Sequence, residues 1–143
     1  MTTTTPSITT TTATLTTATA LRSPWRWSAA LMLTVSGVVH LALVPEHLVE
    51  APYIGYLFLA QTLACATLLI ALLVRDTPAV WVCSAVVAAL AVLAYVASRS
   101  VGLPQIGDEV GQWFGFMGVV AVLSEAVTTA LAVRVLSGLA RRR

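Results

Sequence analysis

Hydrophobic and polar positions follow one another in long blocks along this chain. Four apolar runs cover residues 25–44, 53–74, 78–98 and 113–136, and short segments with Pro, Gly and charge separate them. Each run has about 20 or more residues, which at a rise of 1.5 Å per residue crosses a hydrocarbon core of about 30 Å. The pattern predicts an all-α fold, a four-transmembrane-helix bundle over residues 22–143.

Composition agrees with lipid as the solvent of this bundle. Only 10% of the residues are charged, whereas soluble domains have about 25%. Residues 1–21 are rich in Thr and carry no basic segment followed by an apolar one, so they do not read as a signal peptide. We expect a disordered cytoplasmic tail there.

The arginines predict the orientation. Seven of the eight fall on one side of a four-span arrangement and only Arg99 falls on the other; the seven are Arg22, Arg26, Arg75, Arg134, Arg141, Arg142 and Arg143. The positive-inside rule then places both termini in the cytoplasm. Because these residues flank helices, nucleic acid is not an expected partner. Aromatic residues are expected at the interfaces, with Trp25, Trp27 and Trp81 inside and Tyr53, Tyr56 and Trp113 outside.

Small and polar stripes predict how the helices pack, because helices in lipid associate through close approach and hydrogen bonds. The residues that share a face with Glu125 at helical spacing are Gly111, Phe114, Gly118, Ala121, Val122, Thr128, Thr129 and Ala132. Lipid-facing positions opposite them are Phe116, Val120, Leu123 and Val127. The other stripes are Ser36 and Gly37 beside His40, Ala64 and Cys65 beside Gln61, and Ser84, Ala88, Ala91 and Tyr95.

Glu125 is the one acid inside an apolar run. It follows Trp113 by twelve residues, which is about 18 Å at helical rise and near mid-membrane. A charged carboxylate costs at least a few kcal/mol at that depth, so it has to be protonated, paired, hydrated or bound to a cation. Two interpretations stay open: a proton-relay or ion-binding group, or a structural acid bonded to Gln61, Thr128 or a backbone carbonyl.

Two imidazoles and two carboxylates lie within eleven residues, at His40, Glu46, His47 and Glu50. Pro45 disfavours helix at Val44 and predicts a new short helix after it. His nitrogen with carboxylate oxygen suits a divalent transition metal such as Zn, Fe, Mn or Cu(II). The segment is a candidate metal site, and the alternative is an ordinary wet loop in which His40 bonds a carbonyl that Pro45 frees.

Arg99 and Tyr95 complete the candidate residues on the outer side. Arg99 is expected to pair with Asp108, Glu109 or the Glu46–Glu50 cluster, or else to bind an anion at the mouth of the bundle. From the outer boundary, helical rise places His40 at about 7 Å, Gln61 at about 12 Å and Glu125 at about 18 Å. On facing stripes these three side chains would form a polar ladder, which opens outward as a ligand or proton pathway.

Three segments together resemble small four-helix integral membrane proteins of actinobacteria that are uncharacterised. These are His40 with Pro45-Glu46-His47-Leu48-Val49-Glu50-Ala51-Pro52, then Ser98-Arg99-Ser100-Val101-Gly102-Leu103-Pro104, then Glu125. The resemblance covers residues 28–137. It implies the same fold and an actinobacterial source, and hence the bacterial cell (plasma) membrane. It implies no activity.

Three classes of function remain. The favoured one is a non-enzymatic multi-pass membrane protein whose outward His/Glu cluster binds a metal ion or small ligand. The second is a small oligomeric transporter or proton-coupled channel that uses Glu125. The third is a metal-dependent membrane enzyme, against which the small number of polar residues argues. Expected partners are the lipid bilayer and a second copy or another membrane protein.

Overall fold

In the computed structural model, which describes residues 21–142, the chain forms four long α-helices and one turn of 3-10 helix. In order they are α1 (Arg26–Glu50), α2 (Pro52–Arg75), α3 (Pro78–Ser100), η1 (Gly107–Glu109) and α4 (Phe116–Ala140). Each long helix is apolar enough to cross a membrane. The predicted all-α four-helix fold is therefore confirmed for the described residues. The expected N-terminal tail lies outside them, apart from Leu21, which packs against the core.

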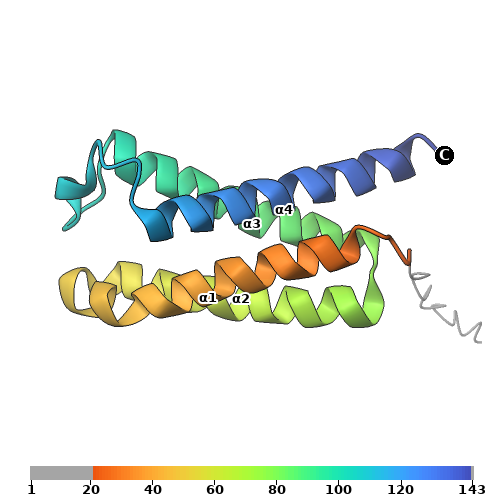
Figure 1. The fold of residues 1–143 in the computed structure, drawn as a ribbon, viewed down its shortest axis with the longest axis horizontal. Helices are drawn as coiled ribbons and strands as arrows, with labels where there is room; N and C mark the ends of the chain where they lie inside the picture. Colours follow the sequence, from red (N-terminus) through yellow and green to blue (C-terminus); the bar gives the residue numbers. More distant parts are fainter. Residues whose placement is uncertain (1–20, 143) are drawn as a thin grey trace, which may run out of the picture.

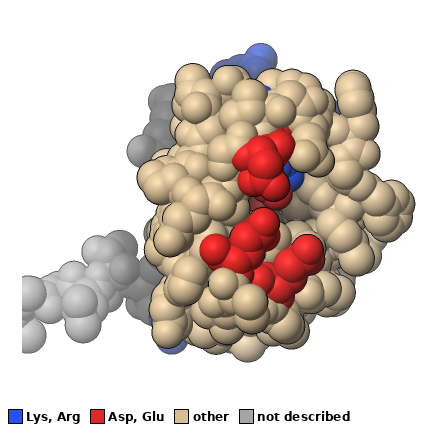
Figure 2. Space-filling view, turned by 90° about the vertical axis from the view of Figure 1, so that its left-hand side faces the viewer, with Lys and Arg blue, Asp and Glu red and all other residues tan. Residues whose placement is uncertain are grey.

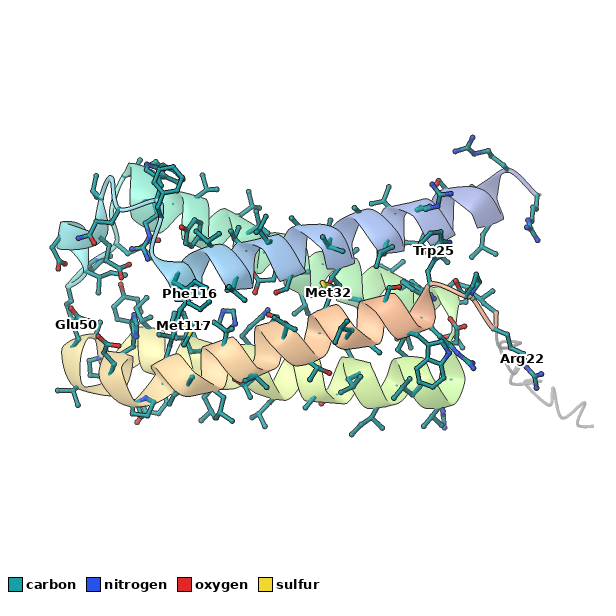
Figure 3. The ribbon with its side chains drawn as sticks, viewed as in Figure 1. Arg22, Trp25, Met32, Glu50, Phe116 and Met117 are labelled. Carbon is teal, nitrogen blue, oxygen red and sulfur yellow. The ribbon has the colours of Figure 1, made fainter. Side chains whose placement is uncertain are left out.

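The four helices form two hairpins that lie on one another. α1 packs mainly against α2, and α3 mainly against α4, while α1 and α4 join the hairpins and the seam between α2 and α3 has the fewest contacts. Figure 1 shows the α1–α2 hairpin below the α3–α4 hairpin, with both ends of the described chain at the same end of the bundle. Arg22 and Trp25 lie at that end and Glu50 at the opposite tip (Figure 3).

The half of the bundle that carries the chain ends is filled with side chains from all four helices. Its core consists of Ala29, Leu33, Cys65, Leu68, Leu72, Trp81 and Ala132. Trp81 is fully buried there, so the expectation that it marks a lipid interface is wrong. Trp25 and Trp27 are exposed, as expected for interfacial residues.

Asp76 explains why Trp81 turns inward. In the short turn between α2 and α3, the Asp76 carboxylate accepts hydrogen bonds from Nε1 of Trp81 (2.7 Å) and from the backbone N–H of Ser23 (2.6 Å). The backbone N–H of Leu21 donates to the Asp76 carbonyl at 2.8 Å. Asp76 is 2% exposed. One buried carboxylate therefore ties the segment before α1 to the α2–α3 turn.

α1 is longer than the sequence predicts. A break after Val44 with a separate short helix is expected from Pro45, yet α1 continues through Pro45 to Glu50. Proline removes one backbone donor, and helices in membranes tolerate that loss because neighbouring groups compensate. The helical hydrogen bonds continue beyond Pro45, and just past the helix end the N–H of Ala51 donates to the His47 carbonyl at 2.9 Å.

α4 begins three residues later than predicted, at Phe116 instead of Trp113. The Trp113 carbonyl accepts a hydrogen bond from the Tyr95 hydroxyl at 2.6 Å, which holds this segment against α3 outside the helix. Gly111 and Phe114, both expected on the buried face with Glu125, precede α4 and are exposed, Phe114 by 91%. Glu125 now lies nine residues into α4, a depth of about 14 Å.

Replacing Asp76 by Ala should lower the free energy of unfolding by about 2–4 kcal/mol, because two hydrogen bonds to a buried carboxylate are lost. Equilibrium unfolding in mixed detergent micelles measures the change. Arg75→Gln, at an exposed neighbouring position, is the control and should leave the free energy almost unchanged. Equal stability of Asp76→Ala and the control would contradict the role given to this carboxylate.

Candidate functional site

The other half of the bundle is hollow. A cavity of about 650 Å³ lies between the two hairpins and is lined by all four long helices and by the segment between α3 and α4. Figure 2 looks onto this end of the molecule and shows acidic side chains gathered around a hollow. Its mouth is edged by Glu46, Arg99, Glu109 and Gln112, and its polar floor consists of His40, Gln61 and Glu125.

Glu125 is the centre of the polar floor. Its side chain is almost completely buried, and its Oε1 atom accepts hydrogen bonds from the Ser36 hydroxyl at 2.9 Å and from Nε2 of Gln61 at 3.3 Å. Nε2 of His40 lies 3.7 Å from the same oxygen. The structure therefore brings together the three side chains of the predicted polar ladder. Helices α1, α2 and α4 each supply one of them.

Thr128, the other suggested partner of Glu125, does not reach it. Its hydroxyl donates to the Ser124 carbonyl at 2.8 Å, so it satisfies its own helix. Ser36 takes that place from α1. Ser36 and His40 are four residues apart, which puts both side chains on one helix face. This spacing placed Ser36 in the predicted stripe beside His40.

The proton positions on His40 follow from its neighbours. Nδ1 of His40 lies 2.9 Å from the Ser36 carbonyl, and a carbonyl only accepts, so Nδ1 carries a hydrogen. In the neutral imidazole Nε2 is then an acceptor. The lone pair of His40 therefore lies on the Nε2 side, toward Glu125.

His47 has the same backbone bond but different surroundings. Its Nδ1 bonds the Leu43 carbonyl at 3.0 Å. Phe58 contacts both imidazoles, with ring centroids 5.0 Å from His40 and 4.7 Å from His47. Phe58 could not be singled out from the sequence, because an aromatic residue in an apolar run is ordinary.

The candidate metal ligands are therefore divided among different places. His40 belongs to the polar floor, His47 packs on Phe58, Glu46 lies at the mouth, and Glu50 is exposed at the tip of the hairpin (Figure 3). Within residues 21–142, no three His, Cys, Asp or Glu side chains are placed so that they could hold one metal ion. Metal binding stays a prediction of the sequence.

Arg99 pairs with Glu109 at the mouth, one of the partners expected for it. Its guanidinium lies 5.2 Å from the centroid of the Tyr95 ring, a cation–π distance. The buried Nε of Arg99 has no hydrogen-bond partner in the described part of the chain. Arg99 thus keeps an unpaired donor, but at a buried atom, while the polar floor offers mainly acceptors.

Ser36→Ala should lower the free energy of unfolding by about 1–2 kcal/mol, because Glu125 loses a buried donor. Unfolding in mixed micelles measures it. Thr34→Ala is the matched control on the same helix, since the exposed Thr34 hydroxyl bonds only the Ala30 carbonyl. The two variants should differ; an equal effect would mean that the bond between Ser36 and Glu125 contributes nothing.

Comparison with known proteins adds no assignment to this geometry. No protein-family model, curated protein or solved structure matches the chain. The resemblance to actinobacterial membrane proteins therefore stays a prediction.

Proposed function

We propose that this chain is a non-enzymatic membrane protein that binds a small amphiphilic ligand in the cavity between its hairpins. The observation that carries the proposal is the cavity itself, about 650 Å³ with a polar floor around the buried Glu125. Binding sites for small molecules usually have volumes of about 300–1,000 Å³, mostly apolar walls and a few convergent polar groups. This cavity has all three properties.

The walls favour an organic ligand over a single metal ion. Between mouth and floor the lining is supplied by Leu43, Ile54, Leu57, Phe58, Leu90 and Met117, among others. Carbon atoms cannot coordinate a cation, and the ring of Phe58 packs against both imidazoles that would be the strongest ligands. An amphiphile uses the walls and the floor together.

The packed half of the bundle favours binding over transport. Directly below the polar floor, Sγ of Cys65 lies 3.7 Å from the Ser36 hydroxyl, and beyond it Leu72 and Trp81 are completely buried. A transported solute would have to displace this core. The cavity lies in the half of the bundle opposite the chain ends and ends at this core, which is the geometry of a binding site.

We further propose that the acid-rich end faces outward from a bacterial plasma membrane. Arginines at the end that carries the chain termini support this orientation through the positive-inside rule; in the described residues they are Arg22, Arg26, Arg75, Arg134, Arg141 and Arg142. Both termini are then cytoplasmic. The ligand would come from outside the cell or from the outer leaflet.

Cysteine labelling tests the orientation. In a Cys83→Ala background, Asp108→Cys should react with a membrane-impermeant maleimide on intact cells, and Arg75→Cys should react only after permeabilisation. Both positions are exposed, while the remaining Cys65 is buried. Labelling of Arg75→Cys on intact cells would reverse the proposed orientation.

Calorimetric titration of the protein in lipid nanodiscs tests ligand binding. The probes are 4-phenylbutylamine, 4-phenylbutan-1-ol and 4-phenylbutyrate, which share one apolar body and differ in the polar group. At least one of these probes should bind with one site per chain, once the heat measured with empty nanodiscs has been subtracted. Ala91→Phe, which fills the cavity wall on α3, should abolish that binding.

Val86→Phe is the matched control, because Val86 is on the same helix but 52% exposed away from the core. It should bind as the unchanged protein does. Binding of a probe by Ala91→Phe would contradict the proposed site. So would the absence of binding in both the unchanged protein and Val86→Phe. If the purified protein contains one transition metal ion per chain, the ligand of this protein is a metal ion and the proposal of an organic ligand is wrong.

A further inference from the structure

We propose that the polar floor selects a primary ammonium group, so that the ligand is an amine with an apolar body. This inference rests on the proposed function and names the chemical class of its ligand. Hydrogen-bond donors and acceptors of the floor carry the argument, together with the charges around the mouth.

The donors of the floor are used within the protein. The Ser36 hydroxyl donates to Oε1 of Glu125 at 2.9 Å, and one N–H of the Gln61 amide donates to the same oxygen at 3.3 Å. Nδ1 of His40 donates to the Ser36 carbonyl at 2.9 Å. Only the second N–H of Gln61 stays available as a donor.

The atoms that stay open are acceptors. Every polar contact that the described residues make with the Glu125 carboxylate goes to Oε1, so Oε2 is left for a ligand. The carbonyl oxygen of Gln61 is a second acceptor, and Nε2 of His40 is a third when the imidazole is neutral. All three side chains line the cavity. A primary ammonium has three donors and no acceptor, which matches these three acceptors of the cavity lining.

Charge along the cavity favours the same group. Carboxylates line it at Glu46, Glu109 and Glu125, and the one arginine of the lining, Arg99, is paired with Glu109. Glu46 and Glu125 are therefore not paired with an arginine of the lining. Acidic side chains also surround the mouth, as Figure 2 shows. A cleft lined by one sign of charge concentrates ligands of the opposite sign and opposes those of its own.

The body of the ligand has to be apolar. Aliphatic side chains and the ring of Phe58 separate the mouth from the floor, so a fully hydrated cation would lose its water without compensation. A hydrocarbon or aromatic body replaces that water by contacts with these side chains. The cavity therefore suits an alkyl or arylalkyl amine better than a small inorganic cation.

The three phenylbutyl probes separate this inference from the proposed function. In nanodiscs, 4-phenylbutylamine should bind with one site per chain, the alcohol at least about tenfold more weakly, and the carboxylate not measurably. Equal or tighter binding of the alcohol or the carboxylate would overturn the amine assignment and leave the binding function in place. If no probe binds, both fall.

Two variants locate the ammonium. Glu125→Gln keeps the size of the side chain but removes its charge. It should weaken binding of the amine by roughly ten- to hundredfold and change binding of the alcohol much less. Gln61→Met removes one acceptor and the N–H that donates to Oε1 of Glu125, but it keeps the carboxylate itself, and it should weaken binding of the amine by roughly three- to tenfold. It provides the test if Glu125→Gln does not fold.

Asp108→Asn is the matched control, because Asp108 is exposed in η1 and does not line the cavity. It should bind the amine as the unchanged protein does. Amine binding that survives in both Glu125→Gln and Gln61→Met would show that the polar floor does not hold the ammonium.

Discussion

A carboxyl group inside an apolar bundle needs hydrogen-bond partners from the protein, because burial without them is costly. At Glu125 these partners gather on one oxygen: Ser36 of α1 and Gln61 of α2 both donate to Oε1. Three helices are thereby fixed in rotation about their axes. The stripe that each presents to the centre, and the face that each leaves to lipid, follow from that arrangement.

Below this carboxyl group the bundle is solid, and above it the bundle is hollow. The difference follows from side-chain size and from the turn at Asp76. Trp81 can fill the lower half because Asp76 accepts its indole N–H, whereas Ala91 and Ala94 face the upper half from the same helix. One helix thus supplies a large side chain where the bundle is closed and small ones where it is open.

Much of this arrangement is readable from the sequence because helical spacing and depth are regular. The four spans, the part of the Glu125 stripe that lies within α4, and the meeting of Glu125 with Gln61 and His40 follow from residues per turn and rise per residue. The continuous α1 could not be predicted from Pro45, since the local rule for proline assumes an unsupported helix. Phe58 and Asp76 were missed because their roles depend on contacts between segments far apart in the chain, which a single sequence does not display.

The weak seam between α2 and α3 has a mechanical consequence. The hairpins are joined along α1 and α4, while Asp76 ties the α2–α3 turn to the segment before α1. Separation of α2 from α3 is therefore easiest at the acid-rich end, with the α1–α4 contact as its pivot. Such an opening would face the hydrocarbon of the bilayer rather than water, so a solute dissolved among lipid tails would reach the polar floor without any helix unwinding.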